Sequence, residues 1–225
     1  DKHLIADKFS IDVTLEKLEC LEDTVWLNSE VITFFLEWWR ERISCGSQGQ
    51  MPSPDAKVKA WFANTYWYGK LAAEGYAGVK RWTRRVDVFE CDKMIIPINS
   101  NNVHWYFACI DFRKKRTEVY DSMSSRHDDV HNTLRQWLKN EYETKKGGDL
   151  NLDEWDIYRP PSPPPQQHNT CDCGVFATLF AIYCSIDKPF DFKQSDIPKL
   201  RRWMVQVIYK VGEELNQIQT GLCQV

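Results

Sequence analysis

One cysteine of this chain has the sequence surroundings of a nucleophile. Cys173 follows the polar turn NTCD and opens the apolar run CGVFATLFAIYCSI, which predicts a buried helix over 173–186. The free N–H groups and dipole of a helix N-terminus stabilise an anion, and they can lower a thiol pKa from about 8.5 to roughly 3.5–7.5. Cys173 is therefore a candidate nucleophile; the alternative is a structural thiol at the start of a core helix. Gly174, the next residue, would leave space for a substrate backbone.

A thiolate that attacks a carbonyl also needs a base that later protonates the leaving amine. His104 begins the apolar stretch HWYFACIDF, which predicts a central strand covered on both faces. Asp121 ends the next predicted strand, and antiparallel pairing of the two strands would place its carboxylate opposite His104. We expect His127 and His131, in or near an amphipathic helix, to face solvent. The loop that holds His168 does not predict its direction.

Two further groups lie close to Cys173 in the sequence. Gln167 can supply a side-chain amide to a developing oxyanion, with the Cys173 N–H as the second donor; the alternative is a polar loop residue. Cys171 is expected to be a bystander, although oxidation could join it to Cys173 in a strained disulfide. A zinc site needs three or four ligands at recognisable spacings, and the sequence has no second close cysteine pair. We therefore expect neither a metal nor a cofactor.

Helices before and after a block of strands surround these residues, which is typical of an α+β domain. The first helix has Asn28 or Ser29 as its N-cap, and the last begins near Ser195 with Pro198 in its first turn. Between them the sequence predicts a loop (46–54), helical pieces over 55–75 broken by Gly75 and Gly78, strands at 93–99, 104–112, 117–122 and 154–159, a helix at 129–142, and a proline-rich loop, RPPSPPPQQHN.

Composition narrows the class of protein. The chain has 225 residues, 43% of them hydrophobic and 27% charged, with no evident linker, so we expect one domain over 1–225. A net charge of −3 provides no basic field for nucleic acid, and no run of 18 apolar residues predicts a membrane span. The first residues lack the apolar core of a signal peptide. Cys109 and Cys184 lie inside apolar runs, which indicates reduced thiols and an intracellular location.

Four segments, in one order, resemble the SUMO-specific (sentrin-specific) cysteine protease family over about residues 10–210. VWLNSEVITFF is similar to its Trp-Leu-Asn-Asp opening helix, and GYAGVKRWTRRVDVF to its basic Arg-Trp-Thr segment. VHWYFACIDFRKKRTEVYDSM resembles its His-Trp strand and Tyr-Asp-Ser strand end, and QQHNTCDCGVF its nucleophile turn. One such match is weak evidence, but four in order are specific.

The resemblance implies a papain-like α+β protease with a central mixed sheet flanked by helices and the active site between helix and sheet. It implies hydrolysis after the C-terminal Gly-Gly of SUMO or a related ubiquitin-like protein, by a monomeric catalytic domain located in the nucleus, the cytoplasm or both. The implied site residues are the triad of His104, Asp121 and Cys173, with Gln167 at the oxyanion hole and Trp105 and Trp26 over a narrow glycine tunnel.

Departures from the family pattern and rival functions remain. Ser29 stands where the family has an aspartate that meets a basic residue of the modifier, and the run PPSPPP is longer in proline. Arg81, Trp82, Arg84 and Arg85 form either a modifier contact or a solvated basic turn. The rivals are a protease for another modifier, an acetyltransferase of the same broad fold, and a modifier-binding module without activity.

Overall fold

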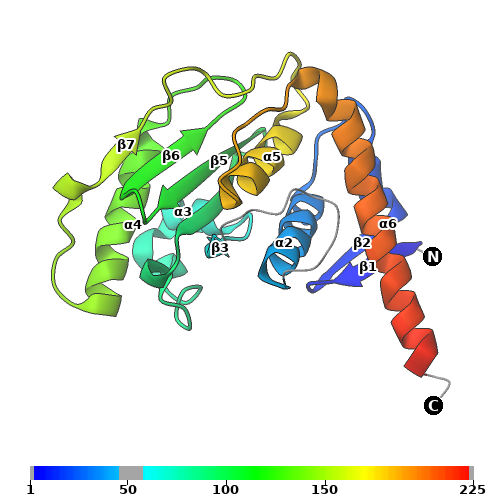
Figure 1. Ribbon diagram of the computed structural model, residues 1–225, viewed down its shortest axis with the longest axis horizontal. Helices are drawn as coiled ribbons and strands as arrows, with labels where there is room; N and C mark the ends of the chain where they lie inside the picture. Colours follow the sequence, from blue (N-terminus) through cyan, green and yellow to red (C-terminus); the bar gives the residue numbers. More distant parts are fainter. Residues whose placement is uncertain (1–2, 46–57, 223–225) are drawn as a thin grey trace.

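The computed structural model describes residues 3–45 and 58–222 and builds a five-stranded mixed sheet (Figure 1). The strands are β3 (Ala60–Phe62), β4 (Lys93–Ser100), β5 (His104–Asp111), β6 (Arg116–Tyr120) and β7 (Asp156–Tyr158), in the order β3-β4-β5-β6-β7. β4, β5 and β6 pair antiparallel, whereas β3 and β7 pair parallel with their neighbours. β5 is thus the middle strand, as its apolar sequence predicted.

Alternate side chains of β5 enter two different apolar cores, one on each face of the sheet. Trp105, Phe107 and Cys109 belong to the core shared with α2 (Ser29–Cys45), α5 (Cys173–Ser185) and α6 (Ile197–Leu222). Tyr106, Ala108 and Ile110 belong to the core shared with α3 (Trp67–Val79) and α4 (Asp128–Lys146). Burial on both faces explains why this antiparallel strand lacks polar alternation.

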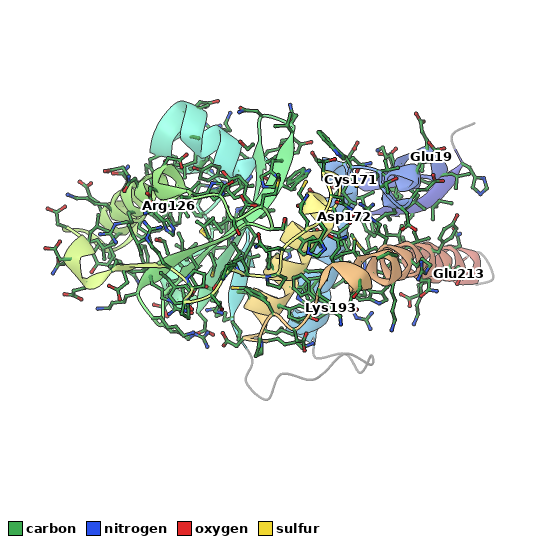
Figure 2. The ribbon with its side chains drawn as sticks, turned by 90° about the horizontal axis from the view of Figure 1, so that it is seen from above. Glu19, Arg126, Cys171, Asp172, Lys193 and Glu213 are labelled. Carbon is green, nitrogen blue, oxygen red and sulfur yellow. The ribbon has the colours of Figure 1, made fainter. Side chains whose placement is uncertain are left out.

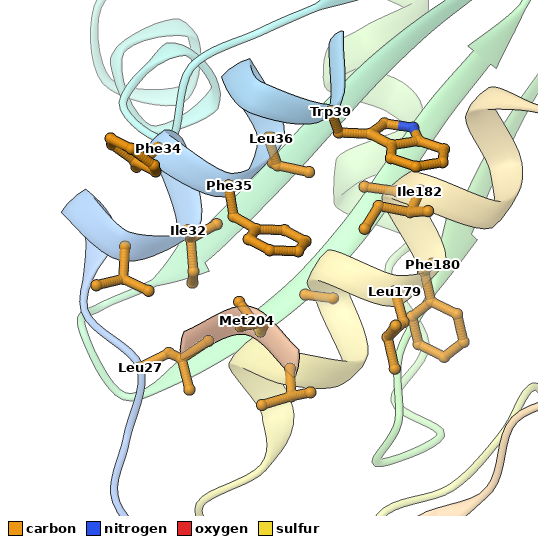
Figure 3. Close-up of a cluster of buried hydrophobic side chains, with 14 of the residues drawn as sticks. Leu27, Ile32, Phe34, Phe35, Leu36, Trp39, Leu179, Phe180, Ile182 and Met204 are labelled. Carbon is orange, nitrogen blue, oxygen red and sulfur yellow. The ribbon is translucent and has the colours of Figure 1, made fainter. Parts of the chain in front are cut away.

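α5 lies between the sheet and α2. Every residue of α5 except Tyr183 is buried, so its sequence is apolar on all sides. Figure 3 shows Phe35 and Trp39 of α2 facing Ile182 of α5, and the Trp39 indole N–H donates to Ser185 Oγ at 2.9 Å. This packing fixes the position of the helix that begins at Cys173.

A hairpin of β1 (Leu4–Lys8) and β2 (Ile11–Thr14) lies beside α6 (Figure 1). A Cβ on Gly212 of α6 would lie 1.9 Å from the carbonyl oxygen of Ile5, so glycine is what permits this close approach. The hairpin and the short helices were not predicted. The latter are α1 (Leu15–Leu18), η1 (Glu19–Leu21), η2 (Val88–Glu90), η3 (Leu152–Glu154) and η4 (Gln194–Asp196).

The region predicted as helical pieces over 55–75 needs correction. Residues 60–62 form strand β3, and α3 begins only at Trp67. Gly75 interrupts α3 as expected, with φ of 65°, but the helix continues through Gly78 to Val79. The predicted loop at 46–54 lies outside the described residues.

The structure bears on two expectations from composition, namely reduced cysteines and the lack of a membrane-spanning helix. The six cysteines described with their side chains are all free thiols. Within residues 3–45 and 58–222, no helix combines the length and apolar character needed to cross a membrane.

Candidate active site

Cys173 is the first residue of α5, as predicted, and only 3% of it is exposed. The residue after it does not have the predicted role. Gly174 is buried, and a Cβ there would lie 2.8 Å from Leu27 Cβ and 3.5 Å from Trp105 Cδ1. The missing side chain therefore lets α5 pack against the segment before α2 and against β5, rather than admitting a substrate backbone.

Strand pairing brings His104 and Asp121 together. β5 and β6 pair antiparallel with Phe107 opposite Tyr120, so Asp121 follows directly at the end of β6 that adjoins the start of β5. His104 Nε2 lies 2.8 Å from Asp121 Oδ1, in agreement with the predicted geometry. The carboxylate side chain is 2% exposed and also accepts the Met123 backbone N–H at 2.7 Å.

The hydrogen bonds of this pair shift both pKa values. The hydrogen bond to Asp121 and the interaction with the nearby Cys173 sulfur raise the pKa of His104 to about 9. Burial alone would raise the pKa of Asp121, but hydrogen bonds from His104, His127 and the Met123 N–H hold it well below its usual value. A protonated imidazole beside a thiol and an ionised carboxylate is the arrangement that stabilises a thiolate and can deliver a proton to a leaving group.

The expectation for two other histidines was wrong. His127 is not turned to solvent: its Nε2 lies 2.8 Å from Asp121 Oδ2, and its side chain is 13% exposed. His131 is buried in the first turns of α4, with Nδ1 2.8 Å from Thr117 Oγ1. The prediction placed both histidines on the solvent-facing side of the amphipathic helix, whereas the N-terminal end of α4 packs against the sheet at β6.

Gln167 is held beside the end of β6. Its backbone N–H donates to the Ser122 carbonyl at 3.0 Å, and its Oε1 accepts the Ser122 hydroxyl at 2.6 Å. One hydrogen of its amide nitrogen is donated to the Asn169 carbonyl at 2.6 Å. An oxyanion would need the second hydrogen of that nitrogen, so the oxyanion role of Gln167 stays a prediction.

A buried ion pair that the sequence reasoning missed supports the turn before Cys173. Arg201, with 1% of its side chain exposed, donates to Asp172 Oδ1 from Nη2 at 2.7 Å and from Nε at 3.1 Å. It also donates to four backbone carbonyls, those of Cys20, Glu22, Val25 and Cys171. Figure 2 shows Cys171 and Asp172 at the start of α5. The signal was present, since Arg201 stands on the apolar stripe of its helix, four residues after Ile197 and three before Met204.

Asp172 is kept ionised by this network. Burial would raise its pKa, but Arg201 and the side-chain amides of Asn169 and Gln194 lower it. Burial raises the pKa of the neighbouring Cys171 thiol, which fits the prediction that Cys171 is a bystander.

The residues predicted to contact a modifier are dispersed. Trp105 is 6% exposed and Trp26 is 48% exposed. The Gly174 contacts bring Leu27, the residue after Trp26, close to Trp105. Ser29 is half-buried at the start of α2, where it borders a cavity of about 560 Å³. The tunnel and the Ser29 contact remain predictions.

The basic turn lies farther away. Arg81, Trp82, Arg84 and Arg85 are exposed, and Lys145 Nζ holds this turn through the Thr83 carbonyl at 2.8 Å. Lys145 stands 18 residues after His127 along α4, which corresponds to roughly 27 Å at 1.5 Å per residue. A modifier would therefore have to contact the turn at a distance from His104 and Asp121.

One cluster of metal-ligand types occurs among the described residues. Cys109, Glu118 and Cys184 offer ligand atoms within 4.8 Å of one another. The Lys93 ammonium lies 3.7 Å from the Cys184 sulfur, and both Glu118 oxygens accept hydrogen bonds, from Arg116 and Tyr120. A cation is thus already present beside these atoms, and the cluster is a structural one.

The sequence of this chain matches a known family and several of its members. The sequence profile of the Ulp1 protease family, C-terminal catalytic domain, matches residues 25–214. Sentrin-specific protease 2 of Mus musculus is 37% identical over 203 residues, which cover 90% of this chain and 33% of the relative. The sentrin-specific protease of Caenorhabditis elegans is 36% identical, with 90% and 28% covered. This chain therefore spans about a third of the length of these relatives.

Solved structures agree with the predicted fold. The C-terminal Ulp1 protease domain in complex with Smt3, the yeast ortholog of SUMO, has a TM-score of 0.77 and 26% identity, with 94% of this chain and 89% of the other covered. The SUMO protease Ulp1 with its catalytic cysteine oxidised to a sulfenic acid has a TM-score of 0.76 and 27% identity, with 92% and 88% covered. The predicted α+β protease fold, with a mixed sheet flanked by helices, is confirmed.

Proposed function

Because this chain belongs to the Ulp1 protease family, we propose that it is a cysteine protease that hydrolyses the bond after the C-terminal Gly-Gly of SUMO. Both precursor processing and release of SUMO from conjugates are within this chemistry. The observation that carries the proposal is the 2.8 Å contact of His104 with Asp121, together with the interaction of the same imidazole with Cys173 at the start of α5. The names of the similar proteins, sentrin-specific proteases and a SUMO protease, support the choice of modifier.

In the proposed reaction, the Cys173 thiolate attacks the carbonyl carbon of the last glycine. His104 uses Nε2–H to bond Asp121, which leaves Nδ1 to give its proton to the departing amine. The Cys173 N–H and the Gln167 amide stabilise the oxyanion. His104 then takes a proton from water, and the resulting hydroxide releases the modifier from the thioester.

We propose that recognition uses the residues around this site. Trp105 and Trp26 cover a tunnel that two consecutive glycines can enter, because a Cβ would collide with the indoles. Ser29 replaces a carboxylate, so the preference for SUMO over a related modifier rests on other contacts. Arg81, Trp82, Arg84 and Arg85 are a separate contact set beyond the C-terminal end of α4.

The remaining properties of the proposal follow from the sequence. Residues 1–225 form one monomeric catalytic domain that needs no cofactor and binds neither nucleic acid nor membrane. Its partners are SUMO or a related ubiquitin-like protein and the conjugates of that modifier. The reduced thiols support an intracellular location, in the nucleus, the cytoplasm or both.

The test is release of lysine from a SUMO–lysine conjugate and reaction with SUMO carrying a C-terminal electrophile. The unaltered chain should do both, and Cys173→Ala should do neither while it still binds SUMO. Cys171→Ala is the matched control and should keep its activity. Turnover by Cys173→Ala, or an equal loss in Cys171→Ala, would refute the assignment. Preference for another modifier in the same panel would change the substrate but not the chemistry.

A further inference from the structure

The carboxylate of Asp121 has two imidazole partners. Its Oδ1 faces His104 Nε2 at 2.8 Å and the Met123 N–H at 2.7 Å. Its Oδ2 faces only one described partner, His127 Nε2, also at 2.8 Å. Both oxygens of a carboxylate that is 2% exposed are thus bonded, and a rotation that freed one oxygen would break bonds at both.

His127 is itself held in place. Its ring stacks on Tyr106, with centroids 4.1 Å apart and planes 17° apart, and Tyr106 also stacks on His104 at 5.9 Å. Tyr106 belongs to the buried face of β5, so it forms a fixed surface under both imidazoles. The backbone of His127 is also constrained, since its carbonyl accepts the His131 N–H at the start of α4. The ring therefore reaches Asp121 in a defined orientation.

Charged side chains of both signs lie around His127. Arg126 and Arg159 both pair with Asp128 at the start of α4. A cavity of about 330 Å³ borders Asp121, His127 and the proline-rich loop after β7. Titratable and charged groups that interact with His104, Tyr106 or His131 in this region include Tyr68, Asp129, Arg135 and Cys173.

We propose that His127 is a positioning residue, whose Nε2–H holds the Asp121 carboxylate in the orientation in which Oδ1 meets His104. The machinery is then a chain of His127, Asp121, His104 and Cys173 rather than a triad. This inference rests on the proposed function for its kinetic consequence but not for its structural one. Without the donor, Oδ2 would be a buried acceptor without a partner, which is a costly state, and the carboxylate would turn toward the cavity to find one.

Two substitutions separate the hydrogen bond from the packing. His127→Phe keeps an aromatic ring on Tyr106 but removes the donor, and His127→Gln keeps an amide donor near the position of Nε2. His3→Phe, at an exposed residue before β1, is the matched control. Should His127→Phe fail to fold, His127→Leu removes the donor with a smaller side chain and carries the same expectation.

The first measurement is the pKa of the His104 imidazole by NMR titration, which needs no substrate. His127→Phe should lower that pKa by about one unit, because a misplaced carboxylate supports the imidazolium less well. His127→Gln should restore most of the shift, and His3→Phe should change nothing. An unchanged His104 pKa in His127→Phe would overturn the proposal. A raised pKa would also overturn it, since His127 would then only withdraw charge from Asp121.

The second measurement is the kinetics of SUMO release. His127→Phe should lower kcat about tenfold with KM unchanged, and it should have no further effect in an Asp121→Asn background. A rise in KM alone, or full additivity with Asp121→Asn, would refute action through Asp121. If the unaltered chain released no SUMO, the proposed function would fail while the titration would still decide the role of His127.

Discussion

Replacing Arg201 by methionine removes the charged group that connects α6 to the turn before Cys173. Methionine fills much of the same volume but donates no hydrogen bond, so Asp172 loses its ion pair. The site is buried, since the Arg201 side chain is 1% exposed. Removing one partner of a buried pair costs about 3–5 kcal/mol, because a charge stays buried without compensation. Asn169 and Gln194 still donate to the other carboxylate oxygen of Asp172, but four backbone carbonyls also lose a donor, so we expect the full range of this cost.

The expected loss is large compared with the total stability. For a domain of 150–250 residues, each kcal/mol lowers Tm by about 2–4 °C, so Arg201→Met should lower it by roughly 6–20 °C. Thermal and urea unfolding measure this, and Arg202→Met, at the exposed next residue, is the control. Arg201→Lys should recover only part of the loss, since one ammonium cannot reach both the Asp172 carboxylate and the four backbone carbonyls that the guanidinium serves. A loss under about 1 kcal/mol in Arg201→Met would refute the reasoning.

Two further predictions concern the imidazole and the hairpin. Because the pKa of His104 is raised to about 9, the imidazolium loses the proton for the leaving amine as pH rises through that value, and kcat/KM should fall there. In Asp121→Asn the pH at which kcat/KM falls should move toward the usual 6.5, with a rate loss of up to about 10⁴-fold. An unshifted pH dependence would mean that another carboxylate orients the ring. Gly212→Ala would place a Cβ 1.9 Å from the Ile5 carbonyl oxygen and should lower the free energy of unfolding by about 1–3 kcal/mol. Gly69→Ala is the control, because it has open space around it and should be neutral or stabilising. Equal stability of the two variants in urea unfolding would contradict the close approach of Gly212 to Ile5.

The parts of the fold that the sequence predicted are those whose pattern was decided by burial. β5 and α5 are covered on all sides, so long apolar runs marked both, and the pairing of β5 with β6 followed from the short turn between them. The placement of His104 opposite Asp121 needed only that pairing. Local sequence was sufficient because the determining contacts are close along the chain.

The parts that could not be predicted depend on contacts that the local sequence pattern does not contain. β3 has three residues, too few to show a period, and it becomes a strand only by pairing with β4. The direction of His127 is set by Tyr106 and Asp121, which its helical pattern does not contain. Gly174 was misjudged for the same reason, since its neighbour Leu27 is almost 150 residues away in the chain.

The five-stranded sheet has short outer strands. Its two outer strands, β3 and β7, have three residues each, while β4 and β5 have eight. An unpaired strand edge is a template for another chain, and short edges are one way in which proteins limit such pairing. The strand that carries His104 has two strands on either side, so it is an inner strand of this sheet. Pairing of another chain with β5 would therefore require the loss of both strands on one side, and the strand that carries His104 would be among the last parts of the sheet to be exposed.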